Sequence, residues 1–226
     1  MQQRLAAGVR AGDPPTLILL EHPPTYTLGV RGDAANILAS GDRLRALGAE
    51  VVRTDRGGDV TFHGPGQIVG YPIVDLRALG IGVADYVRGL EAMLIDTLSG
   101  FGIAAERSAR NAGVWAGDAK LAAIGVRVSR GITTHGFALN VNTDLSWFNH
   151  IVPCGLADVT VTSMAQLAGR AFDIRRVEDA IIGAFAPQFD FDVPAAEARR
   201  TVGALEESPG RQPAAPSTAD RAEVTA

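Results

Sequence analysis

Residues 123–141 have the sequence AIGVRVSRGITTHGFALNV, in which apolar side chains recur at every second position. They form two runs: Ile124, Val126 and Val128, and then Phe137, Leu139 and Val141. A period of two is typical of a β-strand with one buried face. The link SRGITTHG between the runs favours an antiparallel pair. We therefore expect this region to belong to a β-sheet.

Helical patterns predict the elements that flank this sheet. In residues 82–102, GVADYVRGLEAMLIDTLSGFG, one helical face carries Val83, Val87, Leu90 and Leu94, and this helix is expected to lie against the sheet. Residues 173–189 predict a last amphipathic helix, with Val177, Ile181 and Phe185 four apart. Shorter helices are predicted at 1–12 and 40–48, and strands at 16–22, 49–54 and 67–76.

The composition predicts one α/β domain and excludes several classes of protein. A chain of 226 residues that is 46% hydrophobic can bury a real core, here expected over residues 1–205, whereas the Pro- and Ala-rich residues 206–226 predict a disordered tail. A net charge of −4 without a basic block argues against nucleic acid and anionic membranes as partners. No apolar run is long enough for a membrane span, and no signal peptide is evident. We expect a cytoplasmic monomer.

Two residues are singular in this composition. Lys120 is the only lysine among the 21 lysine and arginine residues, and Cys154, in IVPCGLADVT, is the only cysteine. A lysine kept against such a preference for arginine is a candidate for losing its proton, which arginine cannot do. A lone thiol, with a pKa of about 8.5, becomes a working nucleophile beside a positive charge or a base. The ordinary alternatives, a solvated lysine and a small buried cysteine, stay open at this point.

The segment RGGDVTFHGPGQIVGY, residues 56–71, is the third candidate region. Its glycines allow close approach of backbone N–H groups to a ligand, but an ordinary turn between strands explains the pattern as well. It is neither a P-loop nor a dinucleotide fingerprint. His63, His135 and His150 are candidates for proton transfer, yet their spacing matches no zinc pattern, so no metal and no cofactor are predicted.

Four motifs in order, RGGDVTFHGPGQIVGYP, KLAAIG, THGFALNVN and PCGLADVTVTS, together with EHPPTYTLG, resemble the lipoyl(octanoyl) transferases of lipoate biosynthesis over about residues 17–190. The resemblance implies an α/β (α+β) fold like that of biotin and lipoate protein ligases, a mixed, largely antiparallel sheet flanked by helices. It implies that Cys154 carries the acyl group as a thioester and that Lys120 is its catalytic partner. The implied substrate-binding residues are Arg56, Gly57, Gly58, Asp59, Val60, Thr61, Phe62, His63, Ala123, Ile124, Gly125, Gly136, Phe137 and Ala138.

The resemblance also implies the partners. The donor is octanoyl-acyl carrier protein, and the acceptors are the lipoyl domains of 2-oxoacid dehydrogenase complexes and the glycine cleavage H protein. Two alternatives compete with this acyltransferase. An ATP-dependent lipoate or biotin protein ligase would share the fold without needing Cys154, and a non-catalytic acyl-binding protein would lose nothing on replacement of that cysteine.

Overall fold

The two strands predicted within residues 123–141 form a long antiparallel hairpin. In the computed structural model, which describes residues 1–153 and 159–190, β8 (Ala119–Ser129) pairs with β9 (Ile132–Asn140). Arg130 and Gly131 join the two strands with φ angles of 54° and 87°. Two successive positive φ values are typical of a type I′ turn, whose twist matches that of the adjoining strands. The predicted antiparallel pair is confirmed.

This hairpin lies inside a seven-stranded sheet whose main path is β1-β5-β9-β8-β7-β6. Every pair along that path is antiparallel, whereas β10 is parallel to β8. The added strands are β1 (Thr16–Leu20), β5 (Gln67–Ile73), β6 (Glu106–Arg107), β7 (Gly113–Ala116) and β10 (Thr160–Val161). The sheet is therefore mixed and largely antiparallel, as the sequence predicts.

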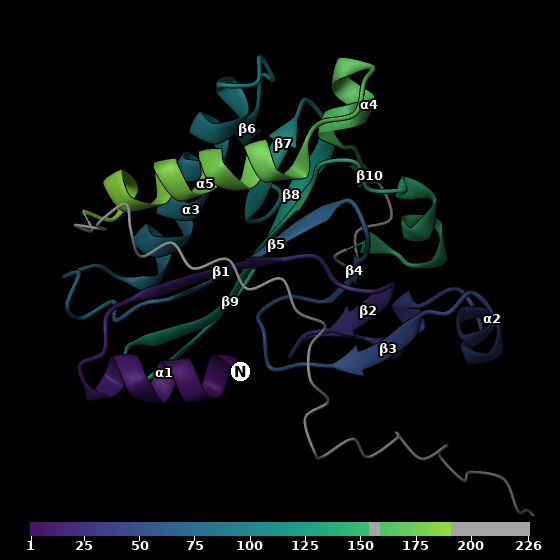
Figure 1. The fold of residues 1–226 in the computed structure, drawn as a ribbon. Helices are drawn as coiled ribbons and strands as arrows, with labels where there is room; N and C mark the ends of the chain where they lie inside the picture. The colour runs from purple at the N-terminus through teal and green to yellow at the C-terminus, as the bar shows by residue number, and fades with distance from the viewer. Residues whose placement is uncertain (154–158, 191–226) are drawn as a thin grey trace, which may run out of the picture.

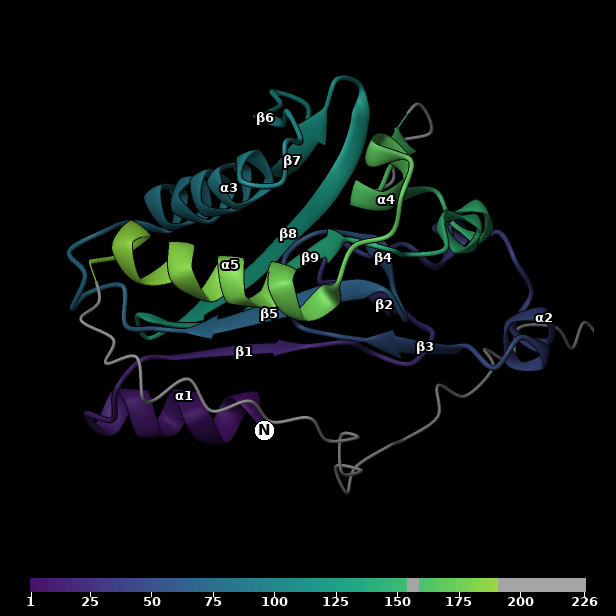
Figure 2. The same cartoon turned by 45° about the horizontal axis from the view of Figure 1, so that its top comes forward.

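Helices lie on both faces of the large sheet (Figures 1 and 2). α3 (Val83–Ser99) and α5 (Ile174–Gln188) cover one face, and α1 (Gln2–Ala11) covers the other. The main hydrophobic core fills the space between the sheet and the α3/α5 pair. On α5 the buried side chains are the three that the sequence predicts, Val177, Ile181 and Phe185.

The helix α3 is confirmed, but its predicted buried face is wrong in part. Val83 is 47% exposed, whereas Tyr86, three residues on, is fully buried. The ring of Tyr86 lies 5.5 Å from that of Phe189, just past the end of α5. Because α3 packs against α5 as well as the sheet, its buried stripe is wider than one helical line and is anchored in the first turn by Tyr86.

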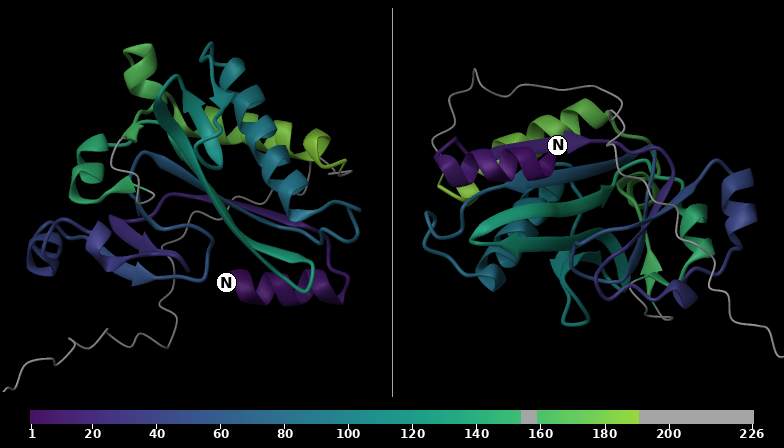
Figure 3. Two further views of the ribbon diagram at one scale, coloured as in Figure 1. Left: turned by 180° about the vertical axis from the view of Figure 1, so that it is seen from behind. Right: turned by 90° about the horizontal axis from the view of Figure 1, so that it is seen from below.

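A second, three-stranded sheet with its own small core lies beside the large one (Figure 3). Its order is β3-β2-β4, with β2 (Thr25–Leu28) parallel to β3 (Glu50–Arg53) and antiparallel to β4 (Val60–His63). The 3₁₀ helix η2 (Leu145–His150) closes its core. The remaining elements are η1 (Ala34–Asn36), α2 (Gly41–Ala46) and α4 (Met164–Ala168).

The predicted boundary at residue 205 and the predicted disordered tail at 206–226 lie outside the described residues and stay predictions. Within residues 1–153 and 159–190, no helix is both long and apolar enough to cross a membrane.

Candidate active site

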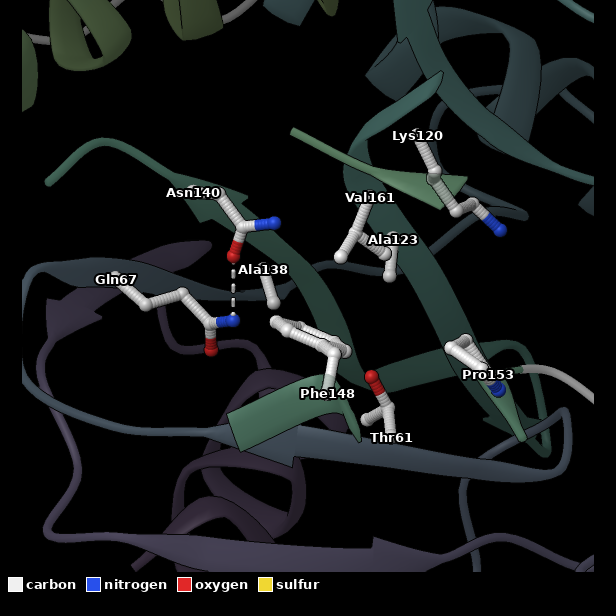
Figure 4. A pocket seen from close by; sticks show the side chains of 9 residues that line it. All are labelled: Thr61, Gln67, Lys120, Ala123, Ala138, Asn140, Phe148, Pro153 and Val161. Carbon is white, nitrogen blue, oxygen red and sulfur yellow. Dashed lines mark hydrogen bonds between the residues drawn. The ribbon is translucent and has the colours of Figure 1, made fainter. Parts of the chain in front are cut away.

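A small pocket opens where the two sheets meet (Figure 4). Its walls come from β4, β5, β8, β9, β10 and the segment around η2. The described residues that line it are Thr61, Gln67, Lys120, Ala123, Ala138, Asn140, Phe148, Pro153 and Val161. Its volume of about 20 Å³ holds about one water molecule.

Lys120 is buried in this pocket's wall, with only 5% of its surface exposed. Its Nζ donates to Asn111 Oδ1 at 2.7 Å and lies 5.2 Å from the centroid of the Trp115 ring. A lysine is almost never this buried unless polar or aromatic partners compensate for its lost hydration. The ordinary alternative of a solvated lysine is therefore excluded.

Cys154, the predicted nucleophile, lies outside the described residues. The residue before it, Pro153, lines the same pocket as Lys120. On the other side of the gap, β10 pairs in parallel with β8, and Val161 lies opposite Lys120. The described residues on both sides of the cysteine-containing segment, Pro153 and Val161, thus line the same pocket as Lys120.

Of the predicted substrate-binding residues, Thr61, Ala123 and Ala138 line the pocket. Alternation along β4 separates Thr61 from its neighbours: Val60 and Phe62 point into the small core. Gly57 lies against β8, where its N–H donates to Val126 O at 3.0 Å.

Three of the predicted substrate-binding residues, Gly125, Gly136 and Phe137, lie where the chain is closely packed beside the pocket. A Cβ on Gly125 would meet the Gly57 carbonyl at 2.8 Å, and one on Gly136 would meet the Gly70 carbonyl at 2.2 Å. The Phe137 ring lies directly over Gly70 and is almost fully buried. Glycine is therefore required here because backbone approaches backbone.

Arg56 fixes the glycine-rich segment in place. Its Nη2 donates to the carbonyls of Thr27 and Asp59 at 2.6 and 2.7 Å, and its Nη1 donates to that of Gly57 at 3.0 Å. The carboxylate of Asp59 accepts from the N–H groups of Val60 and Asp33. These contacts hold residues 56–60 in one shape beside the pocket.

A buried chain of hydrogen bonds, which sequence reasoning missed, crosses from the small sheet to the pocket. Gln67 Nε2 donates to Asn140 Oδ1 at 2.9 Å, and Asn140 Nδ2 donates to the Thr162 carbonyl at 3.0 Å. Since the NH₂ of Gln67 is the donor, its Oε1 accepts from His63 Nδ1 at 2.9 Å. Thr27 Oγ1 lies 3.3 Å from the other ring nitrogen of His63.

The ionisation of His63 follows from its position. Burial lowers the pKa of His63 to about 3, the hydrogen bond with Gln67 opposes this, and the charges of His22, Arg56 and His135 add to it. The imidazole is therefore neutral near pH 7, with its proton on Nδ1.

Asn140 was detectable from the sequence. It follows Ala138 by two residues, so both side chains lie on the same face of one strand.

The other two candidate histidines have their own partners. His135 Nε2 lies 2.6 Å from Asp55 Oδ1, and burial, Arg56 and Arg127 lower its pKa to about 4. His150 Nδ1 lies 2.9 Å from the hydroxyl of Tyr26 in the aromatic core of the small sheet.

Comparison with known proteins identifies the family. The model of the lipoyl protein ligase A/B catalytic domain matches residues 1–186. The chain belongs to this family. It is 52% identical over 194 residues to an octanoyltransferase of Solibacter usitatus, covering 85% of this chain and 87% of that protein. It is 44% identical over 195 residues to a mitochondrial octanoyltransferase of Arabidopsis thaliana, covering 85% and 83%.

Among solved structures, a bipartite lipoate protein ligase from Thermoplasma acidophilum matches with a TM-score of 0.68 at 19% identity, covering 85% of this chain and 80% of that one. At that identity the likeness concerns the fold alone. The predicted ligase-like fold, the resemblance to octanoyltransferases and the assignment as an acyltransferase are confirmed. The roles of individual site residues, the cytoplasmic location and the monomeric state stay predictions.

Proposed function

We propose that this chain moves an octanoyl group from the thioester of acyl carrier protein to a lysine of a lipoyl domain, through a thioester on Cys154. One observation carries the proposal: the buried Lys120 and Pro153, the residue before the only cysteine, line one pocket. The octanoyl group is in keeping with the names of the relatives. The acceptors are the lipoyl domains of 2-oxoacid dehydrogenase complexes and the glycine cleavage H protein.

In the first step Lys120 takes the proton from the thiol of Cys154. The thiolate attacks the carbonyl carbon of the donor thioester, and the resulting tetrahedral intermediate collapses by breaking the bond to the carrier sulfur. The carrier leaves as a thiol with the proton that Lys120 returns. The octanoyl group is then bound to Cys154, and Lys120 is again neutral.

In the second step the amine of the acceptor lysine attacks the octanoyl-Cys154 thioester. Lys120 removes a proton from the attacking nitrogen, and the intermediate collapses to an amide and the Cys154 thiolate. The thiolate recovers its proton from Lys120, which completes the cycle. No ATP is consumed, because the donor thioester already supplies an activated acyl group.

Acyl binding must enlarge the pocket. A volume of about 20 Å³ suits one water, whereas pockets for small ligands typically measure several hundred Å³. Ala123 and Ala138 face each other across paired strands β8 and β9 and keep that wall shallow. We propose that the acyl chain lies over these alanines, with its reacting carbonyl towards Lys120.

The proposal is tested by mixing the protein with octanoyl-acyl carrier protein and measuring its intact mass. We expect one octanoyl adduct that hydroxylamine removes, no stable thioester in Cys154→Ser, and much slower formation in Lys120→Arg. The arginine variant keeps the positive charge but removes the ability to deprotonate. An unmodified wild-type protein would overturn the proposal.

The same sample distinguishes a transferase from a ligase. An ATP-dependent ligase would modify a lipoyl domain with free octanoate and ATP, and Cys154→Ala would leave it active. We expect no modification from free octanoate and ATP, and full dependence on Cys154 with the carrier-bound donor. A non-catalytic acyl-binding protein would modify the lipoyl domain under neither condition.

A further inference from the structure

The segment 111–115, at the start of β7, holds the Lys120 side chain from three directions. Asn111 Oδ1 accepts from Nζ at 2.7 Å, and the Trp115 ring centroid lies 5.2 Å from the same nitrogen. Gly113 lies under the aliphatic part: a Cβ built on it would stand 2.7 Å from Lys120 Cε and 3.4 Å from Nζ. The same Cβ would stand 2.5 Å from the Ala122 carbonyl oxygen, so a side chain at position 113 would disturb the β7–β8 pairing as well as the amine.

A β-bulge next to Lys120 directs the Lys120 side chain towards Asn111, Gly113 and Trp115, which together are called the lysine seat. Val114 pairs with Ala122 and Trp115 with Lys120, so Leu121 is an extra residue on β8 and the register shifts between Val114 and Trp115. Bulges bend a strand and redirect a side chain, and they are enriched beside active sites.

A buried carboxylate on α3 holds the seat itself. Glu91 Oε1 accepts from the N–H of Gly113 at 3.0 Å, and Oε2 accepts from Arg107 Nε at 3.1 Å. The φ angle of Gly113 is 138°, a conformation that side-chain-bearing residues rarely adopt. The position of Gly113, and with it that of Lys120, thus depends on helix α3.

We propose that Asn111 is a positioning residue for the reaction, which holds the Lys120 amine in place through a neutral acceptor while Gly113 keeps the space for it. The inference rests on the proposed function, because it assigns Asn111 a role towards the Lys120 and Cys154 pair. The amide oxygen fixes the direction of one N–H bond but carries no full charge. It therefore orients the amine and still lets the amine lose its proton. A carboxylate at the same place would stabilise the protonated, charged form of Lys120.

The charged groups near the seat, within the described part of the chain, are already paired. Glu91 on α3 binds Arg107 on β6, and Arg110 lies 3.4 Å from Asp118. β10, which flanks Lys120 on the other side, contributes Thr160 and Val161 and no charge. Because Asn111 Oδ1 accepts from Lys120 Nζ, a change of charge at position 111 acts directly on the amine.

The test uses the isosteric variant Asn111→Asp and the truncation Asn111→Ala. Because Cys154 is the only cysteine, alkylation of the intact protein by iodoacetamide between pH 6 and 10 titrates this thiol alone. In Asn111→Asp the new carboxylate neutralises the amine, so we expect the midpoint of alkylation to rise by about one pH unit or more. In Asn111→Ala we expect a smaller rise, and about tenfold slower octanoyl transfer to Cys154 with donor KM changed less than twofold.

Three further variants separate positioning from general damage. Gln3→Glu adds the same charge to the exposed surface of α1 and should leave the midpoint where it is in wild type. Gly113→Ala should slow transfer as Asn111→Ala does and also lower the Tm, because its Cβ would meet the Ala122 carbonyl oxygen at 2.5 Å. Gly12→Ala, at a φ of 107° with open space around it, should change stability alone.

The outcomes distinguish this inference from the proposed function. If wild-type protein forms the octanoyl adduct while Asn111→Asp and Asn111→Ala keep its midpoint and rate, Asn111 has no positioning role and the transferase mechanism stands. If wild-type protein forms no adduct, the transferase mechanism fails and the inference fails with it. The Tm of each variant is measured as well, to verify that the alkylation midpoints and transfer rates are those of folded protein.

Discussion

Replacing His63 by glutamine should remove a large part of the acid sensitivity of the fold. Burial lowers the pKa of His63 to about 3, whereas an unfolded chain has the ordinary value of 6.5. Below pH 6.5 the unfolded state therefore binds a proton that the folded state does not, so the free energy of unfolding falls as the pH falls. This contribution is fully present above pH 6.5 and is lost progressively down to about pH 3.

The magnitude at pH 5 depends little on how low the folded pKa lies. pH 5 is 1.5 units below 6.5 and still well above 3, and each unit is worth about 1.36 kcal/mol. His63 should therefore reduce the free energy of unfolding by about 2 kcal/mol between pH 8 and pH 5. For a chain of this size that corresponds to about 4–8 °C in Tm.

The assay is urea unfolding followed by circular dichroism at pH 8 and at pH 5. For each protein the free energy of unfolding at pH 5 is compared with its own value at pH 8. Any stability that the substitution itself costs at pH 8 therefore cancels. Between pH 8 and pH 5 the free energy of unfolding of the wild type should fall by about 2 kcal/mol more than that of His63→Gln. Thr27→Val, which removes the hydroxyl beside His63 but leaves the ring buried, should keep the wild-type loss. Equal losses in wild type and His63→Gln would refute the reasoning.

Three other substitutions test the pocket and its supports. Ala123→Leu should fill the pocket and slow octanoyl transfer at least tenfold, with less effect on a butanoyl donor, and should lower the Tm because three added carbons exceed a space for about one water. Gly70→Ala places a Cβ 2.1 Å from the Phe137 ring and should lower the free energy of unfolding by about 1–3 kcal/mol, which Phe137→Leu should partly restore in urea unfolding. Glu91→Ala leaves the buried N–H of Gly113 without its acceptor and should cost about 1–3 kcal/mol in the same assay, with Glu91→Gln milder.

Local periodicity predicted those parts of the fold that depend on neighbouring residues. The hairpin of β8 and β9 and the buried stripe of α5 follow from repeats of two and about four residues. The face of α3 was predicted less well, because a helix packed against both a sheet and another helix buries more than one line of side chains. Val83 fits the apolar repeat yet lies beyond those contacts, and it is 47% exposed.

Site residues that stand out in the composition could be predicted from the sequence. Residues whose side chains meet only because two strands pair could not. The hydrogen bond between Gln67 and Asn140 joins residues 73 positions apart, and it exists because β5 and β9 are neighbours with those two residues in register. No local pattern encodes that register. Asn111 was likewise invisible, since its contact with Lys120 requires both the β7–β8 pairing and the bulge within it.

The preference for lysine at position 120 now has two independent physical reasons. Chemistry requires a group that gives up its proton, which a guanidinium does not do. The surroundings also match a lysine, because its chain passes Gly113, which has no side chain, and its Nζ ends at the Asn111 oxygen. A chain that uses arginine for every other Lys or Arg position therefore keeps its one lysine where the proposed mechanism needs a group that can lose its proton.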